Sequence, residues 1–128
     1  MDDASTLQED IKQELLETDE KISEKKAQIE LAEAIERLHE NEDFKLVVLD
    51  GYLEVEAERI FALLTTPMGW KRELNENLMD KLGSIRDLKE FFGVKLRESI
   101  MAPEELTELE QYRKDITTKG STEFGTEE

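Results

Sequence analysis

The chain has 128 residues, of which 39% are charged and 6% aromatic, and its formal net charge is -16 at pH 7. This charge argues against direct binding of nucleic acid or of an anionic membrane, because both attract basic surfaces, and the lack of cysteine excludes disulfides, a thiolate nucleophile and a cysteine-based zinc site. The length suits one domain with a modest core, and six glycines and two prolines leave material for few turns, so we expect few, long helices.

The first 42 residues predict one acidic helix with a coiled-coil-like seam. Overlapping capping boxes in residues 5–9 mark its N-terminus. Apolar residues then recur in the four-three alternation of a coiled coil, and this heptad pattern is broken at Thr18 and Lys25. The seam positions are Leu7, Ile11, Leu15, Thr18, Ile22, Lys25, Ile29 and Ala32.

This helix carries more apolar seam than a small domain is expected to cover. Residues 6–40 would span roughly 50 Å at 1.5 Å per residue, which is too long for the remaining helices to cover. We therefore expect part of the seam to project, to pair with a second copy of the chain or to lie on another protein. The residues predicted to make this contact are Ile11, Leu15, Ile22 and Ile29.

The densest apolar segment, residues 43–64, permits two predictions. Asp50-Gly51 between apolar runs is a strong hairpin signal, and apolar residues alternate with glutamates after it, as in a half-buried strand. The alternative is one helix with a stripe at steps of three and four: Leu46, Leu49, Leu53, Ala57, Ile60 and Leu64, flanked by Phe44, Val48, Val55 and Ala62. We favour the helix, because an internal glycine costs about 1 kcal/mol, whereas burying an apolar side chain contributes roughly 1.5–3 kcal/mol.

A loop and two further helices complete the predicted fold. A proline and a glycine interrupt the periodicity within residues 65–70, and a helix with a regular apolar stripe follows over residues 71–101. Pro103, followed by acidic residues, starts a short helix. We thus predict an all-α fold with a long N-terminal helix at 1–42, a helical core at 43–116 that contains an antiparallel helical hairpin and a short C-terminal helix, and a disordered tail at 117–128.

No constellation in the sequence predicts catalysis, a metal site or a cofactor. Glu36 and His39 have the Glu-x-x-His spacing of di-iron bundles, but such sites need the motif twice, and His39 is the only histidine. Glu54 and Glu58 would share a solvated helix face with Arg59 as a structural partner, without the desolvation that separates the pKa values of a general acid and base. The sequence has no phosphate-binding glycine loop, nucleophile elbow or calcium loop. We expect a non-enzymatic protein.

Two aromatic residues lie outside the predicted apolar stripes. Trp70 lies in the loop and Phe91 lies off the stripe of helix 71–101, whereas Phe92 lies on that stripe. Aromatic side chains often anchor protein interfaces, so Trp70 and Phe91 join the predicted interaction residues.

The N-terminus predicts neither secretion nor membrane insertion. It is acidic and lacks the apolar segment of a signal peptide, and no uncharged apolar run approaches the roughly 20 residues of a membrane span. We expect a soluble protein that is made in a cytoplasm and has no membrane contact.

Several stretches between residues 34 and 101 resemble small helical proteins of tailed bacteriophages whose genes lie among those for head and portal proteins. The matching stretches are residues 34–44, 47–52, 56–60, Leu63-Leu64 with Pro67, and 85–92. The resemblance implies a component of the virion or of its assembly, located in the particle or in the host cytoplasm. It also implies protein partners, namely further copies of the chain or a phage head or portal protein.

Two hypotheses for the function follow. The first is a non-enzymatic structural or assembly protein of a phage particle, such as a minor head, scaffold-like or head-to-tail junction protein, which acts through helix-mediated protein contacts. The alternative is an acidic inhibitor that imitates DNA and blocks a host DNA-binding protein. We favour the first, because lysines and Arg37 are mixed among the carboxylates of the N-terminal segment, whereas a mimic needs regular rows of carboxylates.

Overall fold

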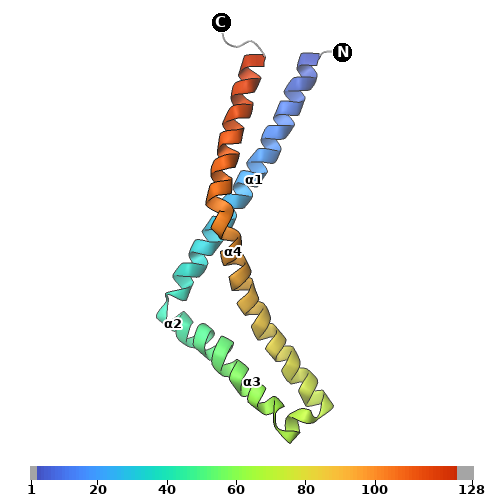
Figure 1. The fold of residues 1–128 in the computed structure, drawn as a ribbon, viewed down its shortest axis with the longest axis vertical. Helices are drawn as coiled ribbons and strands as arrows, with labels where there is room; N and C mark the ends of the chain where they lie inside the picture. The colour runs from blue at the N-terminus through green and yellow to red at the C-terminus, as the bar shows by residue number, and fades with distance from the viewer. Residues whose placement is uncertain (1–2, 124–128) are drawn as a thin grey trace. The chain divides into compact units, whose positions relative to one another are not determined.

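The structure is a computed structural model that describes residues 3–123, with side chains from residue 5 to residue 119. Its elements in chain order are α1 (Asp3–His39), α2 (Glu42–Phe44), the π-helix η1 (Lys45–Glu56), α3 (Ala57–Leu64), the 3-10 helix η2 (Pro67–Trp70) and α4 (Arg72–Glu123) (Figure 1). Residues 3–123 contain no strand. The predicted all-α fold is therefore confirmed, and the hairpin at Asp50-Gly51 is excluded.

The contacts divide the chain into two compact units. The first unit combines Met1–Glu30 with Glu98–Glu128, and the second comprises Leu31–Arg97. We expected a domain boundary near residue 42, after the loop that follows α1. The contacts instead divide the chain inside α1, after Glu30, and inside α4, after Arg97.

The helix α4 continues through Pro103, where we expected a new, short helix to start. Proline lacks an N–H group and its ring crowds the carbonyl four residues earlier, so it normally breaks a helix. Here the preceding Ala102 is completely buried, and the hydroxyl of Thr107 donates to the carbonyl of Pro103 at 3.0 Å. The burial of Ala102 and this hydrogen bond accompany the uninterrupted helix at the proline.

The C-terminal end of α4 also lies beyond the expected position. Residues 117–123, which we assigned to the tail, are helical, and Thr117 Oγ1 donates to the carbonyl of Arg113 at 2.9 Å. Ile116, one residue earlier, is buried, which ties this turn to the first unit. Residues 124–128 of the expected tail lie outside the described residues.

The first unit is an antiparallel pair formed by the N-terminal part of α1 and the C-terminal part of α4. Side chains near the start of α1 contact α4 near Tyr112, and Lys25 further along contacts Glu105, so the helices run in opposite directions (Figure 1). The buried residues of this unit include Thr18, Ile22, Ala102 and Ile116.

The second unit contains the predicted antiparallel hairpin. The segment from η1 to α3 packs on the first half of α4 around four buried residues: Leu53, Ile60, Leu78 and Ile85. Ile60 is the most deeply buried of these, with 1% of its surface exposed. Half-buried apolar residues surround this core, among them Val48, Leu49, Ala57, Leu74, Leu82 and Phe92.

The turn of the hairpin requires a glycine at position 69. Thr66 Oγ1 accepts a hydrogen bond from the N–H of Gly69, and Asn75 Nδ2 donates to the carbonyl of Gly69 at 3.0 Å. These bonds hold the buried glycine against α3, where a Cβ atom would lie 2.1 Å from the carbonyl oxygen of Leu63. Only a residue without a side chain fits there.

The central helix differs from the expected stripe at its start. Leu46, which we placed on the buried stripe, is 67% exposed, whereas Val48 is half-buried. The reason is that η1 uses i→i+5 hydrogen bonds, which change the number of residues per turn.

Candidate protein-interaction surfaces

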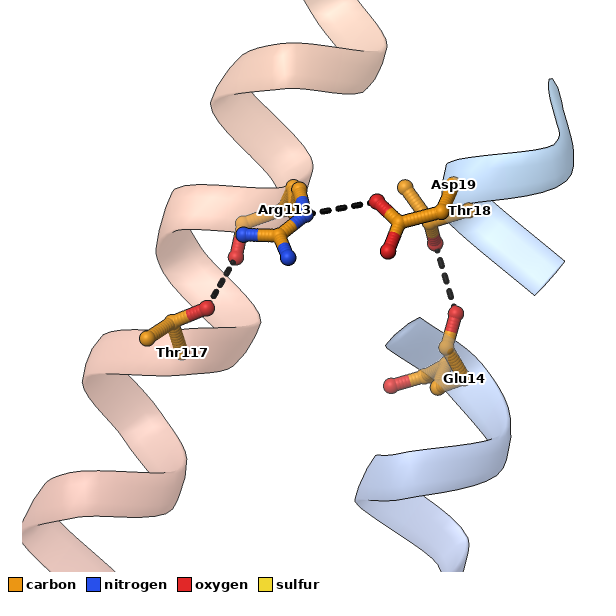
Figure 2. Close-up of polar contacts among 5 residues, drawn as sticks. All are labelled: Glu14, Thr18, Asp19, Arg113 and Thr117. Atoms are coloured by element: carbon orange, nitrogen blue, oxygen red, sulfur yellow. Dashed lines mark hydrogen bonds and ion pairs between the residues drawn. The ribbon is translucent and has the colours of Figure 1, made fainter. Parts of the chain in front are cut away.

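The two polar positions of the α1 seam are accommodated within the chain. Lys25 Nζ lies 2.8 Å from Glu105 Oε1 of α4, and the hydrogen bond to this carboxylate raises the pKa of Lys25. Thr18 is 4% exposed, and its hydroxyl donates to the carbonyl of Glu14 at 2.8 Å (Figure 2), which satisfies a donor that an apolar seam would leave unpaired. The breaks in the heptad pattern thus fit the pairing of α1 with α4.

Two further contacts beside the seam link α1 and α4. Arg113 Nε donates to Asp19 Oδ1 at 2.6 Å (Figure 2), and this bond raises the pKa of Arg113. The Tyr112 hydroxyl donates to Glu14 Oε2 at 2.9 Å, and this bond raises the pKa of Tyr112. Exposed pairs of this kind contribute little stability. Their effect is on alignment, because sliding one helix by a turn would break them together.

The predicted interaction residues of α1 lie on the face that meets α4. Ile22 is buried, and Ile11, Leu15 and Ile29 are half-buried. We expected the remaining helices to be too short to cover this seam, whereas α4 is one helix of 52 residues. Contact of these four residues with another copy or another protein stays a prediction.

Trp70 and Phe91, the predicted aromatic anchors, are both exposed. Trp70 in η2 is 69% exposed, and Phe91 in α4 is 44% exposed. The Phe91 ring lies 5.9 Å from that of Phe92 and has Lys95 Nζ 5.8 Å from its centroid. The two anchors are separated by roughly 30 Å along α4 at 1.5 Å per residue, so they do not form one patch.

Sequence reasoning missed an apolar groove on the second unit. Ala57, Glu58, Phe61 and Ala62 of α3 line it together with Leu82 of α4, around a volume of about 480 Å³. Phe61 is 64% exposed although it is a large aromatic residue. We call this feature the Phe61 groove. Its only signal in the sequence is a phenylalanine off the buried stripe, because its other wall comes from a helix about 20 residues later.

A second exposed apolar set lies on η1. Leu46, Val47 and Val55 are each more than 60% exposed. Contiguous exposed apolar side chains can mark an interaction site, so these three residues are a second candidate surface of the second unit.

An aromatic cluster holds the end of α1 in the second unit. The ring of His39 lies 4.8 Å from that of Phe92 and 5.5 Å from that of Phe44, and its Nδ1 lies 2.8 Å from the carbonyl oxygen of Ile35. Asn41 Oδ1 accepts a hydrogen bond from the N–H of Phe44 and caps the next helix. His39 is thus half-buried among aromatic rings.

One carboxylate of the central helix is paired with an arginine one turn later. Arg59 donates to both carboxylate oxygens of Glu56, at 3.0 and 2.5 Å, and this bonding lowers the pKa of Glu56. Among the described residues, no group of three or more histidine, aspartate or glutamate side chains could hold a metal ion.

Comparisons with known proteins found no matching family model, no similar curated protein and no similar solved structure. None of the helices in the part of the chain that the structure describes is long and apolar enough to span a membrane.

Proposed function

We propose that this chain is a non-enzymatic structural or assembly protein that acts through helix-mediated protein contacts. The observation that carries the proposal is the Phe61 groove of the second unit, whose lining includes a phenylalanine that is 64% exposed. Large apolar side chains are exposed on both units, among them Trp70 at 69% and Ile100 at 71%. Apolar area that the chain does not cover itself is available to a partner.

The partner contact is proposed to use the Phe61 groove. Ala57 and Ala62 are small, so the groove between α3 and α4 has room for an apolar side chain of a partner helix. Grooves of this type bind amphipathic helices through apolar side chains spaced three or four residues apart. The resemblance of residues 34–101 to phage proteins supports a head or portal protein as the partner and a phage particle as the setting.

The experiment that tests this function uses a phage that carries the gene. Mass spectrometry of purified virions and precursor particles should detect the protein, and a deletion strain should assemble particles poorly. Normal particles that lack the protein, together with binding of a host nuclease or polymerase in competition with DNA, would replace the structural role by the DNA-mimic role.

Matched variants test the surface itself. Phe61→Glu puts a charge into the groove and should remove the protein from particles. Leu16→Glu changes a residue of similar exposure, 61%, in the first unit and should leave incorporation unchanged. Equal incorporation of both variants would contradict the role of the groove.

A further inference from the structure

The π-helix η1 is unusually long. It covers twelve residues, whereas π-helical geometry normally occurs as single turns inside α-helices, frequently at functional sites. Phe44 before it (φ -64°, ψ -41°) and Ala57 after it (φ -60°, ψ -43°) have ordinary helical backbone angles. The segment is therefore a helix whose middle follows a different hydrogen-bond register.

The sequence of this segment fits two registers. Counted back from half-buried Ala57 in α-helical turns, Leu53 and Leu46 would lie on the buried face, while Val48, nine residues earlier, would lie on the opposite face. The structure has the other arrangement. Val48 packs on the core and Leu46 is 67% exposed.

One contact and one exposed charge favour the π register. It keeps Phe44 against Phe92, with ring centroids 6.0 Å apart, and it keeps the Asp50 carboxylate exposed. In the α register Asp50, seven residues before Ala57, would turn toward the core, where a charge is unfavourable. The α register gains Leu46 in exchange, so the two registers bury comparable apolar sets.

Gly51 lies in the middle of the π-helical segment. A Cβ atom here would lie 3.0 Å from the carbonyl oxygen of Leu46, five residues earlier, which is tighter than nine in ten real contacts of this kind, so the carbonyl would have to shift by a few tenths of an ångström. Glycine relieves this crowding in the π register. In an α-helix, by contrast, glycine is a poorer residue than alanine.

We propose that residues 45–56 form a conformational switch between two helical registers. The π register exposes Leu46 and buries Val48, and the α register does the reverse. The switch changes which aliphatic side chains the second unit presents while the segment stays helical. It does not depend on the proposed function.

Single cysteines report the register directly, because the natural chain has none. The variants L46C, V48C and V55C are each reacted with a thiol reagent, with and without the added substitution Gly51→Ala. Val55 is the matched control, because it is 61% exposed and, two residues before Ala57, lies on the outer face in the α register as well.

The switch predicts opposite changes at the two test positions. In the natural background L46C reacts faster than V48C. Adding Gly51→Ala should slow L46C and speed V48C, so that the ratio of the V48C rate to the L46C rate rises by about fivefold, the change in the population ratio that about 1 kcal/mol produces, and should leave V55C unchanged. Asp50→Ala, which removes the charge that opposes the α register, should change the two rates in the same directions. If Gly51→Ala does not fold, Asp50→Ala tests the register change in its place.

Two results would overturn the proposal. The first is unchanged rates at positions 46 and 48 in a variant that remains helical by circular dichroism. The second is a parallel rise of all three rates, which indicates local unfolding instead of a register change.

Discussion

Lys25 of α1 and Glu105 of α4 meet in the seam between the two helices, with Nζ 2.8 Å from Oε1. Lys25 breaks the heptad pattern of α1, and Glu105 forms an ion pair with it. In paired helices a polar group at a seam position specifies the alignment, because any other alignment leaves that group among apolar side chains. The contact therefore selects one register for the antiparallel pair.

A charge reversal tests this alignment. Lys25→Glu faces Glu105 with a like charge and should lower the melting temperature measured by circular dichroism. Adding Glu105→Lys restores the pair in reverse and should recover most of the loss. The control is Arg72→Glu, whose partner Glu76 lies in the same helix and which is 92% exposed, so it should have a smaller effect. A double variant no more stable than Lys25→Glu would contradict the pairing.

Stability of the first unit should fall at high pH. The pKa values of Lys25 and Tyr112 are raised in the folded chain by Glu105 and Glu14, from ordinary values of 10.5 and 10.0. Folding thus favours their protonated forms, and this contribution is complete below about pH 10 and is lost as the pH rises through the raised values. Urea unfolding between pH 8 and 11 measures the loss, which should be smaller in the variant with Lys25→Met and Tyr112→Phe. An equal loss in both proteins would exclude these two groups as its source.

Adjacent residues in α3 should respond very differently to truncation. Ile60 is 1% exposed in the core of the second unit, so Ile60→Ala should lower the free energy of unfolding by about 2–5 kcal/mol. Phe61→Ala removes a side chain that is 64% exposed and should change it by about 0.5 kcal/mol or less. Urea unfolding at pH 7 gives both values. Similar losses of stability in the two variants would show that α3 buries a different face from the one described.

Two glycines provide a second matched pair. Gly69→Ala places a Cβ 2.1 Å from the carbonyl oxygen of Leu63 and should destabilise the hairpin strongly. At Gly83 the nearest atom is the far end of the Arg86 side chain, 3.9 Å away, so Gly83→Ala should stabilise α4 by up to about 1 kcal/mol. Thermal unfolding distinguishes the two. Tolerance of alanine at position 69 would contradict the close approach of the turn to α3.

Periodicity predicted much of the fold. The seam of α1, the loop that contains Pro67 and the stripe through Leu78 and Ile85 each depend on local spacing, and the structure has helices and a turn at these places. The helix across Gly51 was also predictable, because its apolar content outweighs one glycine.

Other features depend on contacts between distant residues. Pro103 has the local chemistry of a helix start, yet α4 continues through it, with the completely buried Ala102 beside it. The π register likewise depends on the packing of Phe44 against Phe92, which no local pattern reveals. Of the candidate surfaces, the exposure of Trp70 followed from its loop, whereas the Phe61 groove needs Leu82 from the neighbouring helix.

We propose that α4 of the same chain covers the seam of α1, and that the Phe61 groove is the surface available to a partner. The test is hydrogen exchange measured by mass spectrometry over a wide range of protein concentrations, with the oligomeric state of the protein measured by sedimentation at each concentration. We expect the amides of residues 8–30 to be equally protected at every concentration, including those at which only monomer is present. Protection that appears only as dimers or larger species form would contradict it and would assign Ile11, Leu15, Ile22 and Ile29 to a contact between chains.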